Sequence, residues 1–184
     1  MSPIVKFHLF ESIIQPILLY GSDIWGAFTQ CTKDINSVFM WFIRGVLRVK
    51  PTTCNIITIG ESGMIPPSIK CHESVILNFI RMQCMPKGSV VKSVFDELQL
   101  LDSLGFQCWY TRVIELGKTF DIDLQSYSYS KATKNNVRRK IQNHFIHNWT
   151  TDLNNLQKYP ILRTYLVIKR SFGCEQHLKL VKNV

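Results

Sequence analysis

The residues with the clearest chemical potential form a dense cluster of cations in the last third of the chain. The cluster consists of Lys131, Lys134, Arg138, Arg139 and Lys140. At helical spacing the first three share one face, and the last lies on another. Such a cluster is suited to binding phosphates, and Tyr127 and Tyr129 just upstream can stack on bases. A solvated helix start and a nuclear-import signal are the two alternatives that the pattern leaves open.

Two smaller basic sets are further candidates for phosphate contacts. Arg44, Arg48 and Lys50 follow a strongly apolar stretch that is typical of a helix end. Cations near a helix C-terminus are also favourable without any ligand, so both interpretations stay open there. The second set, which is weaker, consists of Arg163, Lys169 and Arg170.

Metal and catalytic chemistry have little support in the sequence. His144-x-x-His147 and Cys174-x-x-His177 contain residue types that bind zinc, but paired cysteines are missing, and histidines at the solvent or at the core rim are favoured instead. The six cysteines form no Cys-x-x-Cys pair and are interpreted as reduced thiols. No nucleophile elbow or glycine-rich phosphate loop occurs, and we expect the acids Asp96, Glu97 and Asp102 to form a solvated helix face. The sequence therefore predicts no catalytic residue, no metal site and no cofactor in this chain.

The placement of charge divides the chain. Residues 131–184 hold eleven Lys and Arg against two acids, whereas the whole chain has a net charge of +9. The entire excess therefore lies in the last 54 residues, where it suits a polyanion such as nucleic acid or serves as a solubilising helical face. No apolar run is long enough to span a bilayer and no secretory signal is evident, so a nuclear or cytoplasmic protein without a membrane partner is expected.

Apolar periodicity predicts a mainly α protein, with a helical bundle followed by a smaller basic helical segment. The predicted helices cover 3–20, 31–47, 67–85, 91–104, 109–120, 137–156 and a stretch from 162 onward. We expect a kink or break at Pro16, and the stretch 52–59 is compatible with a helical turn or a strand. The predicted domains are 1–124 and 136–184, separated by a polar linker at 125–135 that is rich in Ser and Tyr.

The chain also carries a series of motifs in a recognisable order. The first is PILLYGSDIWG at 16–26, followed by Val46-Leu47-Arg48-Val49 and then by Ile59-Gly60-Glu61-Ser62-Gly63 with Pro66-Pro67. Leu162-Arg163-Thr164-Tyr165 with Lys169 comes last. This order resembles the region after the polymerase palm in reverse transcriptases of LINE-type (non-LTR) retrotransposons. Ser62 departs from the leucine usual in that family.

The resemblance implies a fragment that corresponds to the thumb and the following linker. Such a thumb contacts the backbone of a primer–template duplex or of the element RNA, and it needs a palm domain in cis from a longer protein. The palm's paired aspartates, which hold Mg²⁺ in the parent polymerase, are absent, since the sequence contains no Asp-Asp pair. The alternative is a stand-alone helical protein-interaction module or an inactive retroelement remnant.

Overall fold

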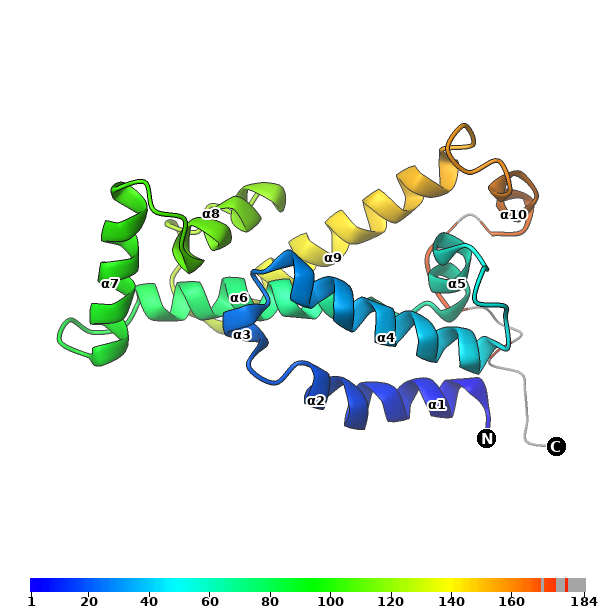
Figure 1. Ribbon diagram of the computed structural model, residues 1–184, viewed down its shortest axis with the longest axis horizontal. Coiled ribbons are helices and arrows are strands. Elements are labelled where there is room, and N and C mark those ends of the chain that lie inside the picture. Colours follow the sequence, from blue (N-terminus) through cyan, green and yellow to red (C-terminus); the bar gives the residue numbers. More distant parts are fainter. Residues whose placement is uncertain (170, 175–177, 179–184) are drawn as a thin grey trace. The chain divides into compact units, whose positions relative to one another are not determined.

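The computed structural model describes residues 1–169, 171–174 and 178. These residues form helices joined by short turns, and no strand occurs among them, which confirms the mainly α prediction. The chain divides into two compact units. The first unit contains 1–20, 33–67 and the described residues from 144 onward, and the second contains 21–32 and 68–143. Helices α4 (Thr29–Leu47) and α9 (Lys131–Asn154) each contribute to both units. Both helices are labelled in Figure 1.

The N-terminal helical segment changes its hydrogen-bonding pattern just before Pro16. Helix α1 (Pro3–Leu9) passes into a π-helical turn, η1 (Phe10–Ile14), and then into α2 (Gln15–Leu18). The Gln15 amide donates to the Phe10 carbonyl, one residue further back than in an α-helix. Proline has no N–H, and its ring crowds the preceding turn of a helix. The break expected at Pro16 is therefore a wider π-helical turn just before the proline.

Gly21 ends this segment in a left-handed conformation with φ of 68°. This backbone angle is easily adopted by glycine and lets the chain turn directly into the short helix α3 (Ser22–Trp25). The sequence predicts that Trp25 anchors the returning chain in the core. Its side chain is only half-buried, however, and it belongs to none of the clusters of buried hydrophobic residues found among the described residues.

Two cores stabilise the first unit. In one of them, Phe10 of η1 lies against Phe39 and Phe42 of α4, with ring centroids 5.8 and 4.4 Å apart, respectively. The second half of the ambiguous stretch 52–59 is helical, because residues 55–59 begin α5 (Asn55–Ser62), whereas residues 52–54 form the turn before it. Alternate positions Ile56, Thr58, Gly60 and Ser62 of α5 are all buried, which explains why its pattern resembles a strand.

The second core of the first unit brings two of the sequence motifs together. The Trp149 indole of α9 donates to the Ile56 carbonyl at 2.9 Å. Tyr165 of α10 (Leu162–Ile168) donates its hydroxyl to the Glu61 carboxylate at 2.8 Å, and α5 and α10 lie side by side in Figure 1. Gly60 lies against both aromatic side chains, so the motif at 59–63 and the motif at 162–165 form one packed cluster.

The second unit has its own aromatic core. It contains α6 (Pro67–Gln83), α7 (Val90–Ser103), α8 (Trp109–Thr119) and the first half of α9. Phe79 is 1% exposed and lies 5.0 Å from the Phe95 ring and 5.2 Å from the Tyr110 ring. Val137 and Ile141 of α9 are fully buried in the same core, which fixes the rotation of α9 about its axis.

Helix α9 begins at Lys131, inside the predicted linker 125–135. Tyr127, from the same stretch, packs against the core of the second unit. The domain boundary itself stays a prediction.

Within the part of the chain that the structure describes, no helix combines the length and the apolar character needed to cross a membrane.

Candidate nucleic-acid interface

The basic cluster of α9 is held by a side-chain cap at the start of the helix. The Thr133 amide donates to Ser130 Oγ at 3.1 Å, and the Thr133 hydroxyl donates to the Ser128 carbonyl at 2.6 Å. Thr133, Val137 and Ile141 are buried at intervals of four residues, so the cations of the cluster occupy the remaining faces. Ser130 was the available sequence signal for this helix start, but it lies in a run of serines and tyrosines that hides it.

Three of the five cations have partners within the second unit. Arg138 forms a salt bridge with Glu73 of α6 at 2.8 Å, and this hydrogen-bonded carboxylate raises the Arg138 pKa. Lys140 donates to the Asp121 carbonyl, and Lys134 lies over the Tyr129 ring, 4.4 Å from its centroid. A cation over an aromatic ring keeps its charge, so Lys134 still contributes to the positive field.

Lys131 and Arg139 are exposed and have no ion pair among the described residues. Lys131 lies in the first turn of α9, which holds no acidic residue. The helix dipole places partial positive charge at this end, so cations here are unfavourable and anions are stabilised. A local rule broken in this way, without a compensating acid, is typical of a binding site. The start of α9 therefore has the electrostatics of an anion-binding surface.

The two tyrosines near the cluster differ in exposure. Tyr127 is half-buried, and its hydroxyl accepts a hydrogen bond from Asn136 at 3.3 Å, so its ring is not free to stack on a base. Tyr129 is 41% exposed and lies beside Lys134. Of the two predicted stacking residues, Tyr129 is thus the one with an accessible ring.

The set at the end of α4 lies in the first unit. Arg44 is half-buried and donates from Nη2 to the Thr53 carbonyl at 3.0 Å and to the Asn55 side chain. Arg48 and Lys50 are exposed, and Arg48 has a left-handed backbone with φ of 55° where the helix ends. Of this set, Arg48 and Lys50 are therefore the exposed cations, whereas Arg44 is engaged with the turn that precedes α5.

Of the remaining basic set, the two described residues, Arg163 and Lys169, do not share an exposed surface. Arg163 is exposed on α10, but Lys169 is 3% exposed and donates from Nζ to the Gly173 carbonyl at 2.6 Å. The prediction that Lys169 contacts nucleic acid therefore requires a correction, because its ammonium serves a backbone contact inside the first unit. Arg170 lies outside the described residues.

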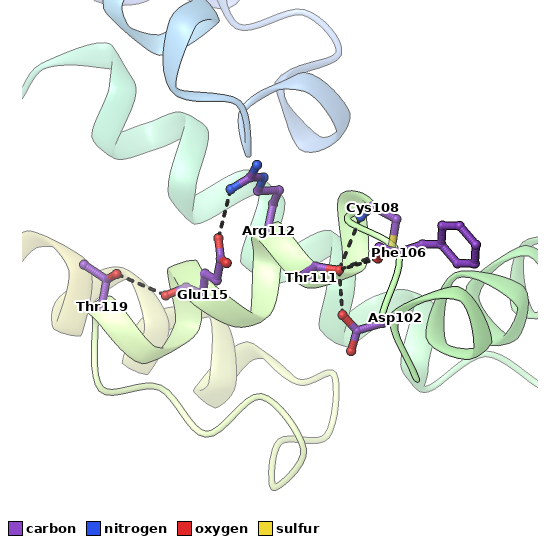
Figure 2. Close-up of polar contacts among 7 residues, drawn as sticks. All are labelled: Asp102, Phe106, Cys108, Thr111, Arg112, Glu115 and Thr119. Atoms are coloured by element: carbon purple, nitrogen blue, oxygen red, sulfur yellow. Dashed lines mark hydrogen bonds and ion pairs between the residues drawn. The ribbon is translucent and has the colours of Figure 1, made fainter. Parts of the chain in front are cut away.

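The prediction that Asp102 belongs to a solvated face is also wrong. Asp102 of α7 accepts a hydrogen bond from the Thr111 hydroxyl at 2.6 Å, and the Cys108 amide donates to the same hydroxyl at 3.3 Å (Figure 2). These contacts cap the start of α8 and join it to α7. These hydrogen bonds therefore hold α7 and α8 against each other, and the Asp102 carboxylate is one of the bonded groups.

Cys71 and His72 are a chemically interesting pair that the sequence analysis does not single out. Burial raises the pKa of the Cys71 thiol to about 12, so the thiol stays protonated at neutral pH. Burial also lowers the pKa of His72 to about 4, and His72 Nδ1 is buried without a hydrogen-bond partner. The pair thus provides neither a thiolate nucleophile nor an imidazolium at pH 7.

We expect His72 to make the protein less stable in acid. Its pKa is lower in the folded state than the value of 6.5 ordinary for histidine, so the unfolded chain binds the extra proton between pH 6.5 and about 4. The free energy of unfolding should fall across this window by up to about 3 kcal/mol. Urea unfolding at several pH values should show that His72→Gln flattens this dependence, whereas His147→Gln, at an exposed histidine, leaves it unchanged.

The histidine and cysteine pairs considered for zinc do not come together in the described residues. Among these residues, no group of three or more His, Cys, Asp or Glu side chains is placed to hold a metal ion. The His144 ring forms a contact with Asn148 at 3.4 Å, and His147 is exposed. His177 lies outside the described part of the chain.

Comparison of the chain with protein-family models, with curated proteins and with solved structures found no match. The residues of the candidate interface form two groups in two units: the start of α9, and the end of α4 with its following turn.

Proposed function

We propose that this chain is a non-catalytic part of a LINE-type RNA-directed DNA polymerase, similar to its thumb and following linker, which binds the nucleic-acid backbone. The start of α9 carries the proposal, because exposed Lys131 adds positive charge in the first turn, where the helix dipole already attracts anions. Exposed Arg139 adds a further positive charge about two turns along the same helix. Contacts of this kind fix the position of a duplex without selecting its sequence. The palm and its Mg²⁺ would belong to the longer parent protein.

The packing of the first unit supports the resemblance on which the wider proposal depends. Two motifs about a hundred residues apart, around Glu61 and Tyr165, are joined by a hydrogen bond and by the close approach of Gly60 to the Tyr165 hydroxyl. Side chains in one close-packed cluster limit one another's size and shape. The two motifs therefore belong to one structural feature and not to two independent matches. This supports a common structural origin of the motifs and leaves the activity to experiment.

A protein-interaction module is the second candidate, and an exposed apolar surface favours it. In the N-terminal helical segment, Ile13, Ile17 and Tyr20 are 56%, 71% and 88% exposed. Exposed apolar surface of this kind marks a site of contact with another protein or domain. A palm domain in cis would use the same surface, so the surface alone does not distinguish a polymerase thumb from a protein-interaction module. A test of nucleic-acid binding distinguishes them.

The variant Lys131→Ala/Arg139→Ala, which removes both unpaired cations, is expected to bind duplex DNA about 30-fold more weakly. This estimate assumes that each lost phosphate contact contributes roughly 1 kcal/mol to the binding free energy. The loss should be equal for unrelated sequences, because only phosphates are contacted. Fluorescence anisotropy with a labelled duplex measures this change. The matched control is Lys87→Ala/Lys118→Ala, which removes the same charge at two exposed positions of the second unit.

The measurement is made at an ionic strength of about 0.15 M, where charges more than about 8 Å from the duplex are largely screened. The control variant should therefore bind within about threefold of the wild type. Equal losses in both variants would mean that net charge alone attracts the duplex, and the assignment to α9 would be wrong. Thermal unfolding of each variant verifies that the substitutions leave the fold intact.

A further inference from the structure

A polar pocket of about 260 Å³ lies in the first unit beside α4. It is lined by Asn36, Ser37, Met40, Arg44 and Asn55. Four of these five side chains can donate hydrogen bonds, and none is a carboxylate. A pocket with this lining is suited to an oxygen-rich anion and unsuited to a cation.

Arg44 is held rigidly at this pocket by neutral groups. Its Nη2 donates to the Thr53 carbonyl at 3.0 Å and to Asn55 Oδ1, and no ion pair of the described residues involves it. The guanidinium therefore keeps its full charge, and its orientation is already fixed before any ligand arrives. Pre-orientation of this kind lowers the entropy that a bound anion would otherwise have to offset.

The hydrogen-bonding capacity of Arg44 is also incomplete. Its Nε is buried and has no partner in the structure, although a buried unsatisfied donor is unfavourable by about 1–3 kcal/mol. Asn55 uses its oxygen for Arg44, which leaves its amide nitrogen as a donor. Asn55 is also the first residue of α5, whose N-cap residue makes no side-chain hydrogen bond. The positive end of that helix therefore adds to the field at the pocket.

We infer that this pocket binds a phosphate group of the nucleic-acid backbone, with Arg44 as the principal contact. The inference rests on the proposed function for the source of the phosphate. Arg48 and Lys50 lie exposed just beyond α4 and extend the positive charge along the chain. A line of cations of this kind is suited to a polyanion more than to a single carboxylate of a protein partner.

The pocket is tested by placing a carboxylate in it without changing Arg44. Ser37 is exposed in the middle of α4, and its hydroxyl is engaged only with the Lys33 carbonyl, so Ser37→Glu and Ser37→Gln should both fold. The glutamate introduces a negative charge beside Arg44, and the glutamine is its neutral match. Thermal unfolding is measured in sodium phosphate and in sodium chloride of equal ionic strength.

Phosphate is expected to raise the unfolding midpoint of the wild type and of Ser37→Gln by about 2–3 °C more than that of Ser37→Glu. General stabilisation by phosphate as a salt, and binding at other basic sites, affect both variants equally and cancel in this comparison. Equal shifts in the two variants would overturn the phosphate pocket, whatever the outcome for α9.

Binding to duplex DNA then identifies the source of the phosphate. Ser37→Glu should bind about 5- to 10-fold more weakly than Ser37→Gln, and its slope of log K against log salt should be less negative by about 0.9, as expected for one lost phosphate contact. An unchanged slope, together with the difference in phosphate stabilisation, would overturn the nucleic-acid source and leave a pocket for free phosphate. A wild-type chain that fails to bind duplex would instead overturn the proposed function, and the phosphate comparison would still decide the pocket.

Discussion

Replacing Gly60 by alanine is expected to lower the free energy of unfolding by about 2–3 kcal/mol, the typical effect of overpacking a core. A Cβ atom at this position would lie 2.6 Å from Trp149 Cζ2 and 3.0 Å from the Tyr165 hydroxyl. Neither group can yield easily, because the Trp149 indole is bonded to Ile56 and the Tyr165 hydroxyl to Glu61. Urea unfolding followed by tryptophan fluorescence measures the loss.

Gly45 provides the matched control for this prediction. It lies in α4, and no atom is within 4 Å of a Cβ built there. Gly45→Ala should therefore stabilise the protein by up to about 1 kcal/mol through the higher helix propensity of alanine. If Gly60→Ala were as stable as the wild type, the close packing of the motif at 59–63 against α9 and α10 would be wrong.

The second large effect is expected in the core of the second unit. Phe79→Ala should destabilise the protein by about 3–5 kcal/mol, because it leaves a cavity among aromatic rings. The Phe79 ring is 1% exposed and lies 5.0 Å from Phe95, 5.2 Å from Tyr110 and 6.1 Å from Trp109. A denaturant titration followed by circular dichroism measures the change in helical stability.

Phe106→Ala is the control of identical chemistry in the same unit. The Phe106 side chain is 60% exposed, so its removal should change stability by no more than about 0.5 kcal/mol. Similar losses for the two variants would show that the ring cluster around Phe79 is not the core of this unit.

Much of the fold could be predicted from local patterns. The stripes of apolar residues indicate α4, α6, α7, α8 and most of α9. In α7 the stripe is mostly not buried, because Phe95 is its one buried residue and Val91, Val94 and Leu101 are exposed. The pattern was weaker where burial was unusual. In α5, four alternate positions are buried because neighbouring elements cover more than one face of a short helix, and this alternation resembles a strand.

The candidate site was less predictable, because its details depend on long-range contacts. Arg138 and Glu73 are 65 residues apart in the chain, so local spacing gives no sign of their salt bridge. Lys169 looks like a surface cation in the sequence, yet its side chain is buried and bonded to the Gly173 carbonyl. The opposite holds for Lys131, which belongs to a basic cluster in the sequence but whose place in the first turn of a helix depends on the position of the Ser130 cap.

The most direct test of nucleic-acid binding by this chain is the salt dependence of its affinity for duplex DNA. Measurement from about 50 to 300 mM NaCl gives the number of phosphates contacted, since each contributes about −0.9 to the slope of log K against log salt. Contacts from Lys131 and Arg139 predict a slope of about −2, and a phosphate bound in the Arg44 pocket would add about −0.9 to it. A slope near zero, or no binding to any duplex, would contradict the proposal and favour a protein-interaction module.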